Sequence, residues 1–264
     1  MSSPHDGKNA MNLSTRTAVH TLLPALTASA ALMTLGGPAQ AAEMCGQYDR
    51  ATVGAYTVQN NVWNPASGQQ CVNPTGSGFE LTKAEGRVPT DGAPKSYPSI
   101  YNGCHYTACS PGTELPARIS SISGAPTSVS YGYTAGGVYN ASYDIWLDPE
   151  PRTDGVSAVE IMIWTNKVGP IQPIGSNTGA TVTIAGTTWQ VWEGDNGRNR
   201  VISYVAPTAV ADLRFDVKEF VNHANSRGFG DSSWYLTSVQ AGFEPWEGGA
   251  GLKVNSFSSE VNTG

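Results

Sequence analysis

Hydrophobic and polar side chains alternate along the segment Val159–Trp164. In a β-strand, successive side chains point to opposite faces of the sheet. Three aliphatic residues suited to a core share one face: Val159, Ile161 and Ile163. A carboxylate, a thioether and an indole share the other: Glu160, Met162 and Trp164. Because an unpaired charge is costly to bury, this second face is predicted to line a functional surface on which Glu160 is a catalytic carboxylate.

Similar alternation recurs in short segments bounded by Gly, Pro, Asn and Asp. Further strands are predicted near residues 56–63, 128–133, 143–148, 180–184, 188–193, 200–205, 234–243 and 253–257. One segment differs, because apolar residues at helical spacing predict an α-helix over about 209–226, with Gly228 as its stop. Many short strands with one helix predict an all-β protein built as a β-sandwich.

The first 42 residues have the pattern of a secretory signal peptide. Lys8 and Arg16 precede an apolar run, and small residues close it before a cleavage site at Ala41 or Ala42. A membrane anchor is the alternative, but Pro24 interrupts the run and the run is short for a span. The sequence therefore predicts a secreted, extracellular protein, soluble after cleavage, with a single catalytic domain over residues 43–264. Whether translation starts at Met1 or Met11 stays open.

The amino-acid composition limits the kinds of partner that the protein is expected to bind. Lys and Arg number 15 against 21 Asp and Glu, for a net charge of −6, and no basic block occurs. Nucleic acid is therefore an unexpected partner. Charged residues make up only 14% of the chain, while Gly is abundant, which is typical of a polar, turn-rich β protein that binds neutral ligands.

Four cysteines follow the predicted signal peptide: Cys45, Cys71, Cys104 and Cys109. In an exported chain an even set predicts two disulfides, with three connectivities open. The short spacing between Cys104 and Cys109 favours a small closed loop. A zinc site needs closely spaced His or Cys, and only His105 and His223 remain after the signal peptide, so no metal is expected.

Asp144 lies in the alternating segment Tyr143–Asp148. If this segment pairs with Val159–Trp164 symmetrically about residue 152, Asp144 lies directly across from Glu160. Two adjacent carboxyls raise the pKa of one of them, so Asp144 could tune a nucleophilic Glu160. The alternative is a solvated strand residue.

Glu244 is a second acidic residue on the polar face of a predicted strand, next to Trp246. From the pattern alone it is either an exposed strand-end residue or the partner of Glu160 in one cleft. Two carboxyls that flank a glycosidic bond are what glycoside hydrolysis requires. One attacks the anomeric carbon or activates water, and the other protonates the leaving oxygen. Trp63, Trp164 and Trp246 would offer stacking surfaces for sugars, although each is also a candidate core residue.

Six motifs, in order, carry a resemblance to a known family. They are Asn60–Trp63, Gly103–Tyr106, Tyr143–Leu147, Glu160–Trp164, Gly169–Gly175 and Gly242–Trp246. Over essentially all of residues 43–264 the chain resembles the family 12 glycoside hydrolases, which are secreted cellulases. The resemblance implies a jelly roll of two curved antiparallel sheets with a concave substrate cleft, and pairing of Cys45 with Cys71 and of Cys104 with Cys109.

The resemblance also implies roles for individual residues. Glu160 matches the nucleophile of a retaining mechanism, Glu244 the general acid/base, and Asp144 the carboxyl that hydrogen-bonds the nucleophile. Met162 matches the residue beneath the sugar at the cleavage point. Five residues match positions that line glucose subsites: Asn61, Trp63, His105, Trp164 and Trp246. The implied substrate is a β-1,4-glucan, with no cofactor and a monomeric enzyme.

Three alternatives stay open at this stage. A xyloglucan-specific endoglucanase of the same family would differ in the loops at the edge of the cleft. A non-catalytic carbohydrate-binding β-sandwich would use the tryptophans but has no need for both carboxylates. A xylanase on a similar jelly roll also uses two Glu residues, but the strings Glu160–Trp164 and Gly242–Trp246 favour the glucanase family.

Overall fold

A computed structural model of the protein describes residues 42–64 and 68–264. Strands dominate these residues, as the alternating pattern predicts, and form sheets of 11, 5 and 2 strands. The predicted signal peptide lies outside the described residues except for Ala42 and stays a prediction.

The 11-stranded sheet holds the segment from which the sequence analysis began. Its strands are β1 (Arg50–Val53), β2 (Tyr56–Gln59), β5 (Ser99–His105), β6 (Ala108–Cys109), β7 (Ala117–Arg118), β10 (Val138–Asp148), β11 (Val159–Val168), β12 (Ser176–Ile184), β13 (Thr187–Asp195), β14 (Arg200–Val205) and β16 (Tyr235–Glu247). The order across the sheet is β1-β2-β5-β16-β10-β11-β14-β13-β12, with β6 beside β5 and β7 beside β16. The pairs are antiparallel except that β11 and β14 run parallel, which the predicted antiparallel arrangement did not include.

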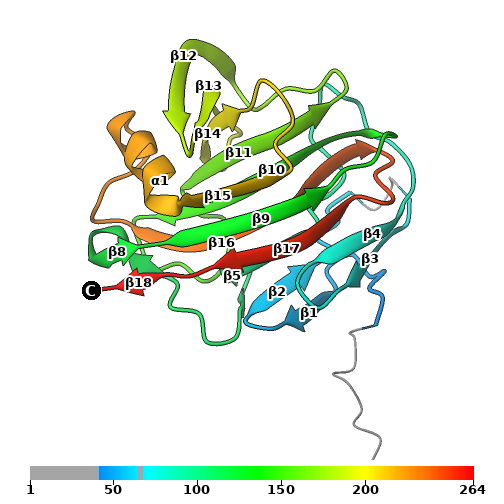
Figure 1. Ribbon diagram of the computed structural model, residues 1–264, viewed down its shortest axis with the longest axis horizontal. Helices are drawn as coiled ribbons and strands as arrows, with labels where there is room; N and C mark the ends of the chain where they lie inside the picture. The colour runs from blue at the N-terminus through cyan, green and yellow to red at the C-terminus, as the bar shows by residue number, and fades with distance from the viewer. Residues whose placement is uncertain (1–41, 65–67) are drawn as a thin grey trace, which may run out of the picture. The chain divides into compact units, whose positions relative to one another are not determined.

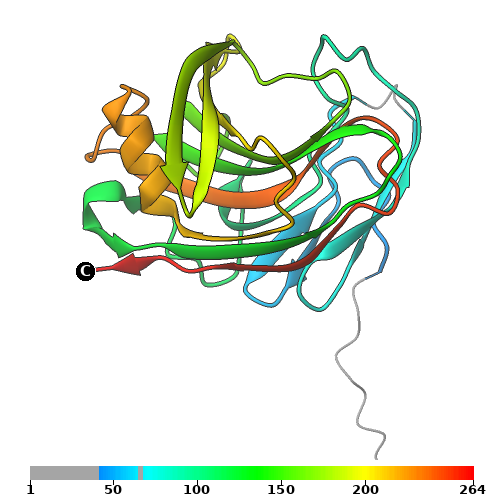
Figure 2. The ribbon, with the colours of Figure 1, turned by 45° about the horizontal axis from the view of Figure 1, so that its top comes forward.

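The 5-stranded sheet has the order β15-β9-β17-β4-β3. Its strands are β3 (Gln70–Pro74), β4 (Phe79–Ala84), β9 (Pro126–Gly132), β15 (Asp212–Asp216) and β17 (Lys253–Ser259). The 2-stranded sheet pairs β8 (Ile122–Gly124) with β18 (Asn262–Thr263), and the 3₁₀-helix η2 (Ile119–Ser121) precedes β8. Figure 1 shows β9 and β17 crossing in front of β10 and β16, and Figure 2 shows how strongly the strands curve.

The core lies between the two large sheets. The aliphatic face predicted for β11 is fully buried there, with Val159, Ile161 and Ile163 all at 0% exposure. Aromatic residues of both sheets pack in the same core, for example Phe243 of β16, whose ring centroid lies 5.3 Å from that of Tyr131 in β9. Burial of this apolar surface supplies the main stabilisation. The described residues thus form the predicted jelly-roll β-sandwich.

The α-helix of the described residues is shorter than predicted. α1 spans Val217–Ser226, whereas residues 212–216 form β15. Asp216 begins the helix with a capping box, in which its side chain accepts from the Lys218 backbone and Glu219 reaches back to the Asp216 backbone. Before this cap, Leu213 and Phe215 alternate with exposed residues and pair with β9. No helix in the described ranges is long and apolar enough to cross a membrane.

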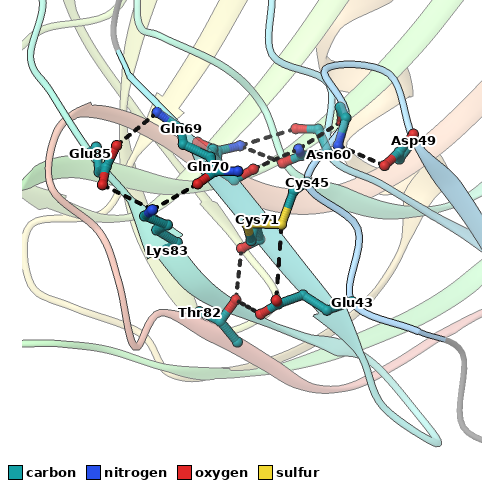
Figure 3. The surroundings of a disulfide bond; sticks show 11 residues. Glu43, Cys45, Asp49, Asn60, Gln69, Gln70, Cys71, Thr82, Lys83 and Glu85 are labelled. Atoms are coloured by element: carbon teal, nitrogen blue, oxygen red, sulfur yellow. Dashed lines mark hydrogen bonds and ion pairs between the residues drawn. A yellow bond between two sulfur atoms is a disulfide. The ribbon is translucent and has the colours of Figure 1, made fainter.

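Both disulfides implied by the resemblance are confirmed. Cys45 bonds to Cys71, and Cys104 bonds to Cys109 across the β5–β6 hairpin. Figure 3 shows the first of these bonds beside Glu43, whose carboxylate accepts a hydrogen bond from the Thr82 hydroxyl. Among the described residues, the ligand atoms of Glu43, Cys45 and Cys71 are close enough together for a metal ion. The disulfide between the two cysteines, however, leaves no thiolates to bind one.

Candidate active site

One face of the 11-stranded sheet points away from the core, and we call it the carboxylate face. Glu160, Met162 and Trp164 project from β11 on this side, as the period of two predicts. A second apolar cluster, separate from the core, forms here: Met162, Trp164, Ile171, Val201, Val205 and Trp246. Glu160 lies beside this cluster and is 8% exposed.

The predicted register between β10 and β11 is wrong by two residues. Asp144 lies across from Met162, and Trp146 lies across from Glu160. Asp148 supports the connection between these strands, because its carboxylate accepts from the Glu150 and Ala158 backbones at 3.0 Å each and from Arg152 at 2.6 Å. Asp144 is a diagonal neighbour of Glu160 and shares a hydrogen bond with it.

Asp144 is a buried carboxyl with 3% exposure. Ser142 donates a hydrogen bond of 3.0 Å from Oγ to its Oδ1. Burial raises the pKa of Asp144 well above its usual range, and the charges of Glu160 and Glu244 raise it further. Burial thus favours the protonated form of Asp144, the form that can donate the hydrogen bond shared with Glu160.

Glu160 accepts a second hydrogen bond, of 3.2 Å, to Oε2 from Asn199 Nδ2. Burial raises the pKa of Glu160 to about 7, while the hydrogen bonds from Asn199 and Asp144 act in the opposite direction. Asn199 lies in the turn between β13 and β14 and was missed in the sequence analysis. The turn signal Asp195-Asn196-Gly197 beside it was visible, but nothing local indicates where the Asn199 amide points.

Glu244 lies on β16, directly across from Asn140 of β10. Asn140 Nδ2 donates to Glu244 Oε2 at 2.6 Å, and its Oδ1 accepts from the Glu244 backbone at 3.3 Å. Burial raises the pKa of Glu244 to about 8, the charge of Glu160 also raises it, and the Asn140 hydrogen bond opposes both. Asn140 was also missed, because only the pairing of β10 with β16 brings it to Glu244.

The three tryptophans assigned to sugar binding differ in their solvent exposure. Trp164 and Trp246 are buried, with ring centroids 6.4 Å apart. Trp63 is 40% exposed. Two carbonyls of the same loop hold the indoles of Trp246 and Trp63, with Gly92 and Pro94 each accepting from Nε1 at 2.8 Å. Asn61, two residues before Trp63, is half-buried and has a φ of 46°.

His105 lies on the same side of the sheet. Its Nδ1 is 3.0 Å from Gln59 Oε1, and Gln59 Nε2 donates to Gln240 Oε1 at 3.2 Å. Burial lowers the pKa of His105 to about 4, with Arg50 adding to the effect, so the ring is neutral near pH 7. Gln240 lies across from Asp144, which joins this network to the carboxyl groups. Gln59 and Gln240 were not identified from sequence.

The model of one protein family, described as glycosyl hydrolase family 12, matches residues 54–262. The chain belongs to this family.

Relatives of this family 12 enzyme include cellulases and xyloglucanases. A protein of Mycobacterium tuberculosis named probable cellulase Cel12b is 50% identical over 151 residues, which are 57% of this chain and 99% of that protein. The xyloglucan-specific endo-beta-1,4-glucanase A of Emericella nidulans is 35% identical, over 84% of this chain and 92% of its own. A solved structure of the cellulase endo-1,4-beta-glucanase CelB2 is 58% identical with a TM-score of 0.82, and the match covers 84% of this chain and 99% of that one.

Several buried polar groups of the family 12 enzyme have no hydrogen-bond partner among the described residues. Four lie on β10, β11, β13 and β14 of the large sheet, around Glu160 and Met162: Trp146 Nε1, Trp164 Nε1, Trp192 Nε1 and Ser203 Oγ. Unpaired polar groups are costly in a buried site, so these positions suit ordered water.

Proposed function

We propose that this family 12 enzyme is an endo-acting β-1,4-glucanase that cleaves internal bonds of cellulose-type glucans and mixed-linkage β-glucan with retention of configuration. The observation that carries the proposal is a set of three carboxyl groups on the adjacent strands β16, β10 and β11. All three have raised pKa values, and each is held by a polar partner. The pKa of Glu160, at about 7, is lower than that of Glu244, at about 8, which is the order that nucleophile and acid require.

In the first step, Glu160 is the nucleophile that attacks the anomeric carbon. The hydrogen bonds from Asn199 and Asp144 favour its ionised form. Glu244 is the general acid, because its raised pKa of about 8 keeps it protonated at neutral pH. It donates this proton to the leaving O4, and a covalent glucosyl-enzyme forms.

In the second step, the same groups work in reverse. Glu244, now ionised, takes a proton from water, and the oxygen of that water attacks the anomeric carbon. The bond to Glu160 breaks, and its carboxylate is released. Two inversions at the anomeric carbon give net retention. No cofactor takes part in this sequence of steps.

The carboxylate face would supply the glucan-binding subsites. We assign Met162 to the floor beneath the sugar at the cleaved bond. Sugar contacts are assigned to five residues: Asn61, Trp63, His105, Trp164 and Trp246. Neutral His105 donates from Nδ1 to Gln59, which leaves Nε2 free to accept from a sugar hydroxyl.

We propose cellulose-type glucan rather than xyloglucan as the substrate because this chain is more similar in sequence to a cellulase of known structure than to a xyloglucanase of known structure. The CelB2 structure is 58% identical, whereas a xyloglucanase structure from Bacillus licheniformis is 28% identical with a TM-score of 0.73. That match covers 84% of this chain and all of the other. Xyloglucan specificity is the second candidate, because the Emericella relative is named as a xyloglucan-specific enzyme and the match covers 92% of its length.

We also propose that the enzyme is secreted as a monomer after removal of residues 1–42. Two disulfides support export, because such bonds persist in oxidising compartments. N-terminal sequencing of protein from the culture medium tests the cleavage site, and light scattering tests the monomer.

The decisive experiment measures reducing-end release by residues 43–264 on carboxymethylcellulose, mixed-linkage β-glucan, xyloglucan and xylan, beside Glu160→Ala. Activity on the first two that disappears in the variant is expected. Preferential hydrolysis of xyloglucan would favour the second candidate. Glucan binding without hydrolysis in either protein would identify a binding module and contradict the proposal.

A further inference from the structure

Three large apolar side chains are exposed among the described residues, and all three are aromatic: Tyr48 at 58%, Trp63 at 40% and Tyr106 at 43%. Trp63 already belongs to the proposed glucan site. Tyr106 has no role in the mechanism, yet it stands at the tip of the β5–β6 hairpin, where the backbone is unusually constrained.

The conformation of this tip is unfavourable for residues with side chains. Tyr106 has a φ of 44° and Thr107 a φ of 70°, in the left-handed region that normally favours glycine. The disulfide between Cys104 and Cys109 closes the hairpin, and the Thr107 backbone donates to Thr153 at 2.9 Å. A two-residue hairpin loop of this type requires positive φ at both positions, and glycine or asparagine normally occupies them, so a tyrosine at this position points to a role for its ring.

A chain of contacts connects the Tyr106 ring to the proposed active site. It stands at 89° to the His105 ring with centroids 4.7 Å apart. His105 in turn contacts Gln59, and Gln59 donates to Gln240, which pairs with Asp144. The exposed Tyr106 ring thus contacts His105, and two hydrogen bonds lead from His105 through Gln59 to Gln240.

We propose that Tyr106 is a stacking platform for a glucose unit of the glucan chain at a distance from the cleaved bond. The inference rests on the proposed function, because that function supplies the occupant. A neutral sugar suits this position, since an aromatic ring offers apolar area to the C–H face of a sugar and needs no counter-charge. The constrained backbone holds the ring in place before binding, so little conformational freedom is lost when a chain docks.

Glycine substitutions at the tip separate binding from folding. Tyr106→Gly removes the ring and suits the positive φ, so the hairpin keeps its shape. Thr107→Gly makes the same kind of backbone change one residue later and leaves the ring in place. Tyr106→Trp keeps an aromatic surface. We expect Tyr106→Gly to raise KM for mixed-linkage β-glucan about two- to tenfold, with melting temperatures of all three variants close to wild type.

The expected signature is a loss that grows with substrate length. Tyr106→Gly should affect long chains more than cellotriose, Thr107→Gly should match wild type, and Tyr106→Trp should restore the affinity. Equal losses on all lengths, or the same loss in Thr107→Gly, would mean a structural role and overturn the platform.

Binding is measured separately from hydrolysis by affinity electrophoresis in gels that contain β-glucan. Retardation that weakens in Tyr106→Gly but not in Thr107→Gly supports the platform, whether or not the chain cleaves glucan. Equal retardation of the two variants and wild type, or none of wild type, overturns it. Retardation of wild type without any release of reducing ends would instead overturn the proposed function.

Discussion

Asn199 donates a hydrogen bond of 3.2 Å from Nδ2 to Oε2 of Glu160. The donor comes from the turn after β13, and Asn196 holds it in place by accepting from the Asn199 backbone at 3.0 Å and donating to its Oδ1 at 2.9 Å. The proposed nucleophile is thus oriented by a residue 39 positions further along the chain.

Replacement of Asn199 by alanine should weaken catalysis through Glu160. The hydrogen bond lowers the pKa of Glu160, so its loss raises that pKa and reduces the ionised fraction at mildly acidic pH. Hydrogen bonds to charged groups contribute about 1.5–3 kcal/mol, which corresponds to a fall in kcat of roughly tenfold or more. The acidic limb of the pH profile of kcat/KM should move to higher pH. Asn262→Ala, in the exposed strand β18, is the control, and an unmoved acidic limb in Asn199→Ala would contradict the role.

Glu160→Gln should be more stable than the wild type, and the difference should grow with pH. The pKa of Glu160 rises from 4.5 to about 7 on folding, so the folded state binds its proton more tightly than the unfolded state. The stabilisation from this proton is complete below pH 4.5 and is lost as pH rises towards 7. Glutamine has no such proton to lose. Urea unfolding at pH 4, 6 and 8 should show a gain of about 1–3 kcal/mol at pH 8. A pH-independent difference, or the same gain in the exposed control Glu260→Gln, would show that burial of charge is not the cause.

Asp144→Asn and Asp144→Ala should differ clearly in activity. Burial raises the pKa of Asp144 well above its usual range and so favours the protonated form, which asparagine resembles because it can still donate to Glu160. Alanine removes the donor and leaves a cavity. We expect kcat to fall less than tenfold in the first variant and about tenfold further in the second. Equal losses in the two variants, measured on mixed-linkage β-glucan, would indicate that Asp144 acts as a charge.

The two disulfides should contribute unequally to stability. Cys45 and Cys71 are 26 positions apart and Cys104 and Cys109 only 5, so the first bond restricts the unfolded chain more. Loop-closure entropy predicts losses of about 3.5 and about 2 kcal/mol for the respective double serine variants. Urea denaturation of the purified variants checks the order. A larger loss from the short loop would mean that it stabilises the folded state directly.

Local sequence was sufficient for features that depend on one strand. The period of two in β11 separated Ile161 from Glu160 correctly, because the pleat alone decides which side each occupies. It failed for residues 212–216, where Leu213 has helical spacing to Val217 but also alternates with Phe215 as in a strand. Pairing with β9 and the cap at Asp216 decided in favour of the strand.

The sequence by itself determined the β-sandwich class, the apolar face of β11, and Glu160 and Glu244 as candidates for chemistry. These depend on periodicity and on residue type, which are local properties. Only the tertiary structure decided that Asn199 reaches Glu160, that Asn140 holds Glu244, and that Asp144 lies diagonal to the nucleophile. Each of these contacts joins different strands or turns, so it depends on strand order and register, which packing of the whole sheet selects.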